Sequence, residues 1–122
     1  MLWKKKLAER INHIDLAKKT DLFIVAPASA NTIAKLAHGM ADNMLTATAL
    51  ALPSTTPKLI APAMNTKMYE NPLTKKNLKI LQEVGYQEIL PKSGLLACGD
   101  TGRGALADIS VIIESIDNAL TK

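Results

Sequence analysis

Aromatic residues are scarce in this chain, which has one Trp, one Phe and two Tyr, or 3% of its 122 residues. Proteins that bind single-stranded nucleic acids stack bases on aromatic rings, so this scarcity argues against that class. The net charge of +4 is spread over separate groups of lysines rather than gathered in one dense basic stripe. We therefore predict no nucleic-acid partner and interpret the lysine excess as a solvated face. A weak attraction for an anionic, phosphorylated substrate is the functional alternative.

Cysteine, histidine and long apolar runs are also rare. The single Cys98 cannot form an internal disulfide, which is typical of a protein in the reducing cytosol, so we expect a cytoplasmic location. We predict no signal peptide and no membrane span, because no apolar run has the required length. One cysteine and two distant histidines, His13 and His38, lack the spacing of metal ligands, so we predict no metal site.

Short aliphatic runs alternate with helical patterns along the chain. A run of β-type apolar residues before a proline is typical of a buried parallel strand, and hydroxyl or amide side chains before an alanine-rich segment favour a helix start. The patterns predict a helix within residues 1–20, strands at 22–27, 58–61 and 87–90, helices at 33–50, 74–84 and 108–120, and loops at 63–72 and 93–104. This alternation predicts an α/β domain with a parallel sheet covered by helices on both faces.

The carboxyl ends of the strands carry the first candidate residues. In open α/β sheets, ligands bind outside these ends. After the first strand, Ser29, Ala30, Asn31 and Thr32 open a helix, whose free N–H groups suit a phosphate or a polar cofactor rim. A plain helix cap is the structural alternative for these residues.

A similar arrangement follows the second predicted strand, at Ala63, Met64 and Asn65, with Met68 shortly after. The Asn65 amide both donates and accepts hydrogen bonds, so it could hold a substrate carboxylate. A turn asparagine that bonds its own backbone is the structural alternative.

Two further residues have reactive side chains. Cys98 lies in a glycine-rich loop beside Asp100, where a lid over a ligand is one interpretation and a small buried side chain is the other. His13 could act as a general base, although a lone histidine is more often structural. We interpret His38, inside a predicted helix, as structural.

Four motifs in one order resemble the homo-oligomeric flavin-containing cysteine decarboxylases, which include phosphopantothenoylcysteine decarboxylases and the peptidyl-cysteine decarboxylases of lantibiotic synthesis. Each motif is weak alone, but the ordered set is specific and covers about residues 11 to 115. The motifs are His13-Ile14-Asp15-Leu16, Pro27-Ala28-Ser29-Ala30-Asn31-Thr32, Pro62-Ala63-Met64-Asn65 with Met68, and Ala97-Cys98-Gly99-Asp100 with Gly102 and Gly104.

The resemblance implies a three-layer Rossmann-like (flavodoxin-like) fold, FMN as cofactor and a homo-oligomer, a trimer or a multiple of trimers. It implies FMN-dependent decarboxylation of 4'-phosphopantothenoylcysteine in coenzyme A biosynthesis, because the loop around Cys98 favours that branch over the peptidyl enzymes. A peptidyl-cysteine decarboxylase and a non-catalytic or truncated subunit are the alternatives. The family's first strand-helix units have no counterpart before His13, so we expect one domain over residues 1–122 that lacks them.

The resemblance also implies a role for each candidate residue. His13 would be the base, Asn65 would bind the substrate carboxylate and Cys98 would donate a proton. Asp42 and Asn43 would lie near a subunit interface where a neighbour completes the active site. The flavin would be lined by Ser29, Ala30, Asn31, Thr32, Ala63 and Met64, and the substrate by Asn65, Met68, Leu95, Leu96 and Ala97.

Overall fold

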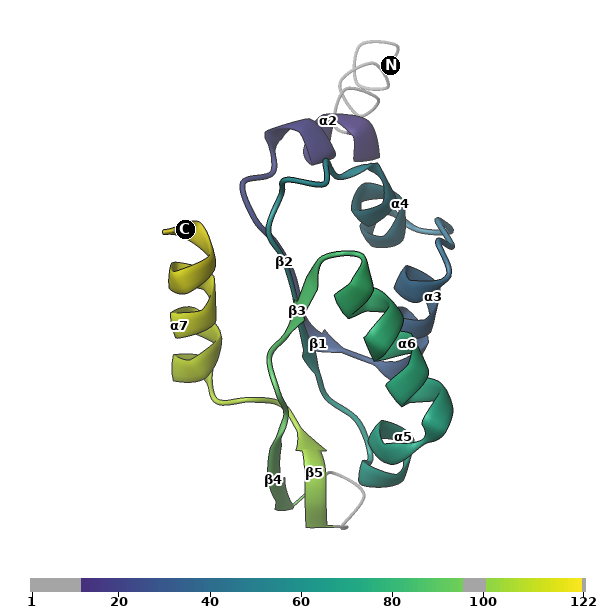
Figure 1. Cartoon of the computed structure of the whole chain (residues 1–122), viewed down its shortest axis with the longest axis vertical. Coiled ribbons are helices and arrows are strands. Elements are labelled where there is room, and N and C mark those ends of the chain that lie inside the picture. The colour runs from purple at the N-terminus through teal and green to yellow at the C-terminus, as the bar shows by residue number, and fades with distance from the viewer. Residues whose placement is uncertain (1–11, 96–100, 122) are drawn as a thin grey trace, which may run out of the picture.

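The computed structural model describes residues 12–95 and 101–121 and contains a parallel sheet of three strands. The strands are β1 (Phe23–Ala28), β2 (Lys58–Pro62) and β3 (Tyr86–Glu88), in the order β1-β2-β3. Leu59 of β2 lies opposite Ile24 of β1 and Gln87 of β3. Helices α3 (Ala30–Ala37) and α6 (Pro72–Glu83) lie on one side of the sheet and α7 (Ile109–Leu120) lies on the other (Figure 1).

The central strand explains the layers. Every residue of β2 is buried, and neighbouring residues of a strand point to opposite faces. Ile60 joins the cluster that contains Ile33 of α3 and Leu81 of α6. Leu59 and Ala61 join the opposite cluster, against which Ile112, Ile116 and Ala119 of α7 pack. The predicted α/β fold with helices on both faces is therefore confirmed.

The remaining elements lie toward the two ends of the molecule's long axis (Figure 1). Helix α2 (His13–Lys19) lies next to α4 (Met44–Ala51) at one end. The short helix α5 (Thr66–Glu70) and a hairpin lie at the other end. The hairpin consists of β4 (Lys92–Leu95) and β5 (Thr101–Ala105), which pair antiparallel. No helix in the described part of the chain is long and apolar enough to cross a membrane.

The prediction of one helix over residues 33–50 was wrong. Gly39 has a φ of 67°, a left-handed conformation that terminates helices, and α3 ends just before it. Asn43 then begins α4 with a capping box, in which the Asn43 side chain accepts the Thr46 N–H at 2.8 Å. Helix α6 also begins earlier than predicted, at Pro72, because the side chain of Asn71 caps it by accepting the Leu73 N–H at 2.9 Å.

Both predicted loops contain regular structure. Residues 63–72 include α5, and the glycine-rich segment 93–104 contributes most of the hairpin. The third strand begins at Tyr86 and ends at Glu88, one residue before the predicted start and two before the predicted end. Helix α7 agrees closely with its predicted range, with Asp108 at its N-cap position.

Both tyrosines are buried, and their ionisation can report on the packing of the sheet. Burial raises the pKa of Tyr86 to about 12, and burial together with the Glu88 carboxylate also raises the pKa of Tyr69. In an unfolded chain both phenols would ionise at about pH 10. Because the folded state binds the phenol protons more tightly, the free energy of unfolding has its full value below that pH. It falls as the pH rises toward 12.

We therefore expect phenolate absorbance to appear together with unfolding in an alkaline titration followed by ultraviolet absorbance and circular dichroism. The same titration in denaturant is the control, and there the phenols should ionise near their ordinary pKa. Phenolate that forms at that ordinary pKa while the circular dichroism stays native would contradict the burial of both rings.

Candidate functional site

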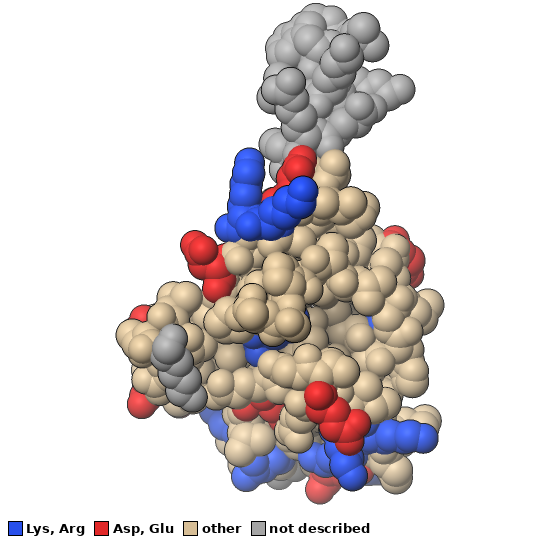
Figure 2. All heavy atoms as spheres, turned by 45° about the horizontal axis from the view of Figure 1, so that its top comes forward, with Lys and Arg blue, Asp and Glu red and all other residues tan. Residues whose placement is uncertain are grey.

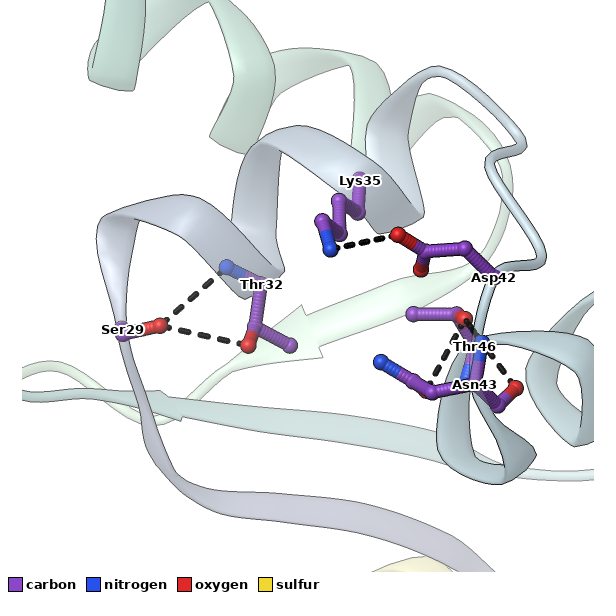
Figure 3. Close-up of polar contacts among 6 residues, drawn as sticks. All are labelled: Ser29, Thr32, Lys35, Asp42, Asn43 and Thr46. Atoms are coloured by element: carbon purple, nitrogen blue, oxygen red, sulfur yellow. Dashed lines mark hydrogen bonds and ion pairs between the residues drawn. The ribbon is translucent and has the colours of Figure 1, made fainter.

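The first part of the candidate site is the N-terminus of α3, at the carboxyl end of β1. Ser29 is the N-cap residue, and its Oγ accepts the Thr32 N–H at 3.1 Å. The same Oγ donates to Thr32 Oγ1 at 3.2 Å (Figure 3). Ser29 and Asn31 are exposed, whereas Ala30 and Thr32 are half-buried. The helix start therefore offers small side chains and the positive end of the helix dipole to solvent.

The second part follows β2 and lies against the first. The Ala63 N–H donates to the carbonyl oxygen of Ala28 at 3.0 Å, which ties the end of β2 to the end of β1. Met64 is half-buried and packs against the core. The backbone geometry thus brings Ser29, Ala63 and Met64 to the same edge of the sheet.

Asn65 caps helix α5. Its Oδ1 accepts the N–H of Lys67 at 2.8 Å and that of Met68 at 3.4 Å. This is the structural alternative set out for Asn65, an asparagine that bonds the backbone of its own turn. The Met68 side chain is 49% exposed on the same short helix.

The β4–β5 hairpin packs closely against the segment that follows β2. The Met64 N–H donates to the carbonyl oxygen of Gly104 at 2.8 Å. A Cβ on Gly104 would lie 2.3 Å from the Met64 carbonyl oxygen, and a Cβ on Gly102 would lie 2.8 Å from Thr66 Oγ1. Both glycines have positive φ, 145° and 141°. Glycine at these two positions therefore lets β5 lie directly on the segment that contains Asn65.

The segment that joins β4 to β5 contains most of the predicted substrate lid. Leu95 is the last residue of β4. Leu96, Ala97 and Cys98 fall in residues 96–100, outside the described residues, so the structure does not test their predicted roles.

Tyr69 links three elements around this edge and was missed by the sequence analysis. Its hydroxyl donates to Glu88 Oε2 at 2.8 Å, which connects α5 to the end of β3. The Lys75 ammonium lies 3.6 Å from the centre of its ring. Only its proximity to Asn65 in sequence could have indicated a role, because a lone tyrosine carries no motif.

His13 does not join the other candidate residues within one chain. It is the first residue of α2, and the Asn12 side chain caps that helix by accepting the N–H groups of Ile14 and Asp15 at 3.0 Å each. Helix α2 lies at the opposite end of the long axis from α5 and the hairpin (Figure 1). The structure therefore separates the predicted base from Asn65.

His38 lies at the C-cap of α3 rather than inside a helix. Its Nε2 is 2.9 Å from Asn77 Oδ1 on α6. This contact agrees with the structural interpretation of His38. Among the described residues, no group of three His, Cys, Asp or Glu side chains is arranged to hold a metal ion.

Asp42 and Asn43 lie between α3 and α4 (Figure 3). Asp42 Oδ2 lies 2.7 Å from the Lys35 ammonium, which lowers the pKa of that carboxyl group through a hydrogen bond. Asn43 forms the capping box of α4 with Thr46. Both residues therefore have a local structural role, which leaves the predicted interface role untested.

The sequence profile of the Flavoprotein family matches residues 1–121. The chain belongs to the Flavoprotein family. It is 64% identical over 110 residues to a probable phosphopantothenoylcysteine decarboxylase of Streptococcus mutans, which covers 90% of this chain and 62% of that protein. It is 41% identical over 121 residues to the mouse phosphopantothenoylcysteine decarboxylase, with 99% of this chain and 59% of that protein covered.

Solved structures agree with this family membership. A cysteine-to-serine mutant of PPC decarboxylase, complexed with pantothenoylaminoethenethiol, superposes with a TM-score of 0.88 at 42% identity and covers 90% of this chain and 60% of that one. The FMN-binding protein AtHal3 gives a TM-score of 0.79 at 44% identity and covers 87% and 57% of the two chains. This chain thus spans less than two thirds of the length of each relative named here.

Proposed function

We propose that this chain takes part in the FMN-dependent decarboxylation of 4'-phosphopantothenoylcysteine. The observation that carries the proposal is the edge where the ends of β1 and β2 meet. There the α3 N-terminus, the Asn65 segment and the glycine-anchored hairpin lie together. The proposal draws further support from the 64% identity to a probable phosphopantothenoylcysteine decarboxylase.

The residues at this edge fit FMN. Ala28, Ser29, Ala30 and Ala63 have small side chains, so a planar ring can approach the backbone, and the N-terminal turn of α3 favours polar or anionic groups. We assign flavin contacts to Ser29, Ala30, Asn31, Thr32, Ala63 and Met64. When bound, the flavin would supply oxidation of the substrate thiol and the later return of hydride.

The protein's part is to bind, orient and protonate. Asn65 would hold the substrate carboxylate with Met68 beside it. Leu95, Leu96 and Ala97 would cover the substrate from the hairpin, and Cys98 would deliver a proton to the decarboxylated product. The contacts of Gly102 and Gly104 hold β5, the strand that follows these residues, against the Asn65 segment.

A second copy of the chain would supply His13. Because α2 and α5 lie at opposite ends of the molecule, a site that uses both His13 and Asn65 needs two copies. Exposed apolar residues on α2 and α4 are available for such an interface, namely Ile14, Leu16, Met44 and Leu45. The proposal therefore includes a homo-oligomer, with a trimer as the expected unit.

A peptidyl-cysteine decarboxylase is the second candidate. An FMN-dependent cysteine decarboxylase, SpaF, superposes with a TM-score of 0.70 at 38% identity. The two candidates share the proposed flavin site at the edge where β1 and β2 end, called here the flavin edge. They differ in the substrate molecule that bears the cysteine. Competition between phosphopantothenoylcysteine and a peptide with a C-terminal cysteine would separate them.

The test is a visible spectrum of the purified chain after FMN is added and the excess removed, followed by an assay of CO2 release. We expect about one flavin per chain and CO2 from phosphopantothenoylcysteine in preference to the peptide. Bound flavin with CO2 only from the peptide would favour the second candidate. A colourless protein that releases no CO2 from either compound would contradict both.

A further inference from the structure

A cavity of about 360 Å³ lies away from the flavin edge, beside the amino ends of β2 and β3. Lys58 and Tyr86, the first residues of these strands, line it together with residues of α3 and α4. Pockets that hold small organic ligands have volumes of about 300 to 1,000 Å³. The cavity is therefore large enough for a small ligand.

A buried lysine, Lys58, contributes a positive charge to this cavity. Lys58 is only 8% exposed, and its ammonium donates to the carbonyl oxygens of Pro53 at 3.1 Å and Thr56 at 3.0 Å. An ammonium has three N–H donors, so one remains after these two bonds. No carboxylate among the described residues forms an ion pair with Lys58.

A buried charge without a counter-charge is unfavourable, and proteins normally pair such groups. The second lysine at the cavity, Lys35, is already neutralised by Asp42 at 2.7 Å. Burial also lowers the pKa of Lys58, with no opposing contribution from a nearby acid. The cavity thus has one unit of uncompensated positive charge and one spare N–H donor.

The remaining walls are mainly apolar. They include Leu36, Met40, Ala49, Leu50, Leu52 and Val84. Met40, Leu50 and Val84 are half or more exposed, so they form an open apolar margin around the buried ammonium. Figure 2 turns this end toward the viewer. Blue and red groups lie directly below the grey atoms, and the surface below them is mostly tan, with a little blue visible in a depression.

We propose that this cavity binds an amphiphilic monocarboxylate, with the carboxylate on the Lys58 ammonium and the apolar chain against Met40 and Leu50. A single charge and a single spare donor match a monoanion better than a phosphate dianion, which needs several donors. The start of α4, a helix that lines the cavity, is occupied by its own capping box. This inference is independent of the proposed decarboxylation.

The probe is decanoate, added below its micelle concentration to the full 122-residue chain. Methyl labels on methionine and leucine report its position by NMR, because Met40 lines the cavity and Leu120 lies on α7, on the other side of the sheet. We expect the Met40 signal to move saturably with decanoate while the signal of Leu120, which is 52% exposed, stays fixed. Decylammonium should leave both in place, because its charge repels Lys58.

Two variants test the contacts. Lys58→Met should weaken decanoate binding about tenfold or more, by removing a charge-assisted hydrogen bond. Since this change also frees the loop at Pro53 and Thr56, Leu50→Glu is a second test that keeps the buried lysine. It places a like charge at the margin and should weaken binding too. Leu73→Glu, at a residue 71% exposed on α6 and outside the cavity, is the matched control and should bind normally.

Several outcomes would overturn the proposal. They are a Met40 signal unmoved by decanoate, equal shifts at Met40 and Leu120, equal binding of decylammonium, or unchanged affinity in Leu50→Glu. If light scattering showed that a second copy covers the cavity and decanoate neither bound nor shifted that association, the occupant would be the second copy and the proposal would be wrong.

Discussion

Replacing Gly104 by alanine is expected to weaken the docking of the hairpin on the Asn65 segment and to lower the free energy of unfolding by roughly 1–3 kcal/mol. The added Cβ would lie 2.3 Å from the Met64 carbonyl oxygen, a distance at which the backbone must move. The φ of 145° adds a second penalty, because residues with a Cβ rarely adopt it. Urea denaturation of both proteins would measure the difference.

Gly94→Ala is the matched control, because Gly94 lies in the same hairpin and a Cβ there would meet nothing within 4 Å. It should unfold at nearly the same urea concentration as the unmodified chain. If decarboxylation proceeds as proposed, Gly104→Ala should also raise KM more than Gly94→Ala, because the cover over the substrate would be displaced. Equal stability of the two variants would show that the hairpin does not depend on this contact.

Replacing His13 by asparagine is expected to reduce decarboxylation by roughly 100- to 10,000-fold, the usual contribution of a general base. The side chain is half-buried at the start of α2, and Asn12 rather than His13 caps the helix. The fold should therefore be preserved, with an unchanged circular dichroism spectrum. The assay is CO2 release at saturating substrate.

His38→Asn is the control for a histidine with a structural contact, since its Nε2 meets Asn77 on α6. It should retain activity.

Mixing His13→Asn copies with Asn65→Ala copies tests the shared site directly. An assembly that contains both can form a site with His13 from one copy and Asn65 from the other, so the mixture should regain activity that neither variant has alone. No recovery after full exchange of subunits would contradict a site built from two copies.

The central strand of the parallel sheet could be predicted because it is short, mostly aliphatic and wholly buried. The run from Lys58 to Pro62 in β2 is buried on both faces of the sheet. A strand of this kind appears in the sequence as a continuous apolar run, which is easily recognised. The helix over 33–50 could not be divided from composition alone. Its alanine-rich pattern continues past Gly39, and the division depends on a left-handed glycine and an asparagine cap.

The hairpin and α5 were missed for a different reason. Glycine disfavours strands, so Gly94, Gly102 and Gly104 indicated a loop. The strand β5 forms there because its glycines allow contact with Met64 and Thr66, a tertiary interaction that no local pattern contains. Helix α5 has five residues, too few for a helical pattern to stand out in the sequence.

The candidate site was partly predictable on the same grounds. Residues that follow parallel strands meet at one edge, so Ser29 and Ala63 could be grouped from their positions alone. His13 could not be placed, because its distance from that edge depends on where α2 packs against α4. Tyr69 was missed because its structural role is a hydrogen bond to Glu88, a residue distant in the sequence.

The separation of His13 from Asn65 has a consequence for how activity would scale with the amount of protein. If each site needs residues from two copies, an isolated chain has no complete site. Dilution below the dissociation constant of the assembly would then reduce the specific activity, following mass action. Decarboxylation would become steeply dependent on concentration, so the abundance of the protein could switch the reaction on without any separate regulator.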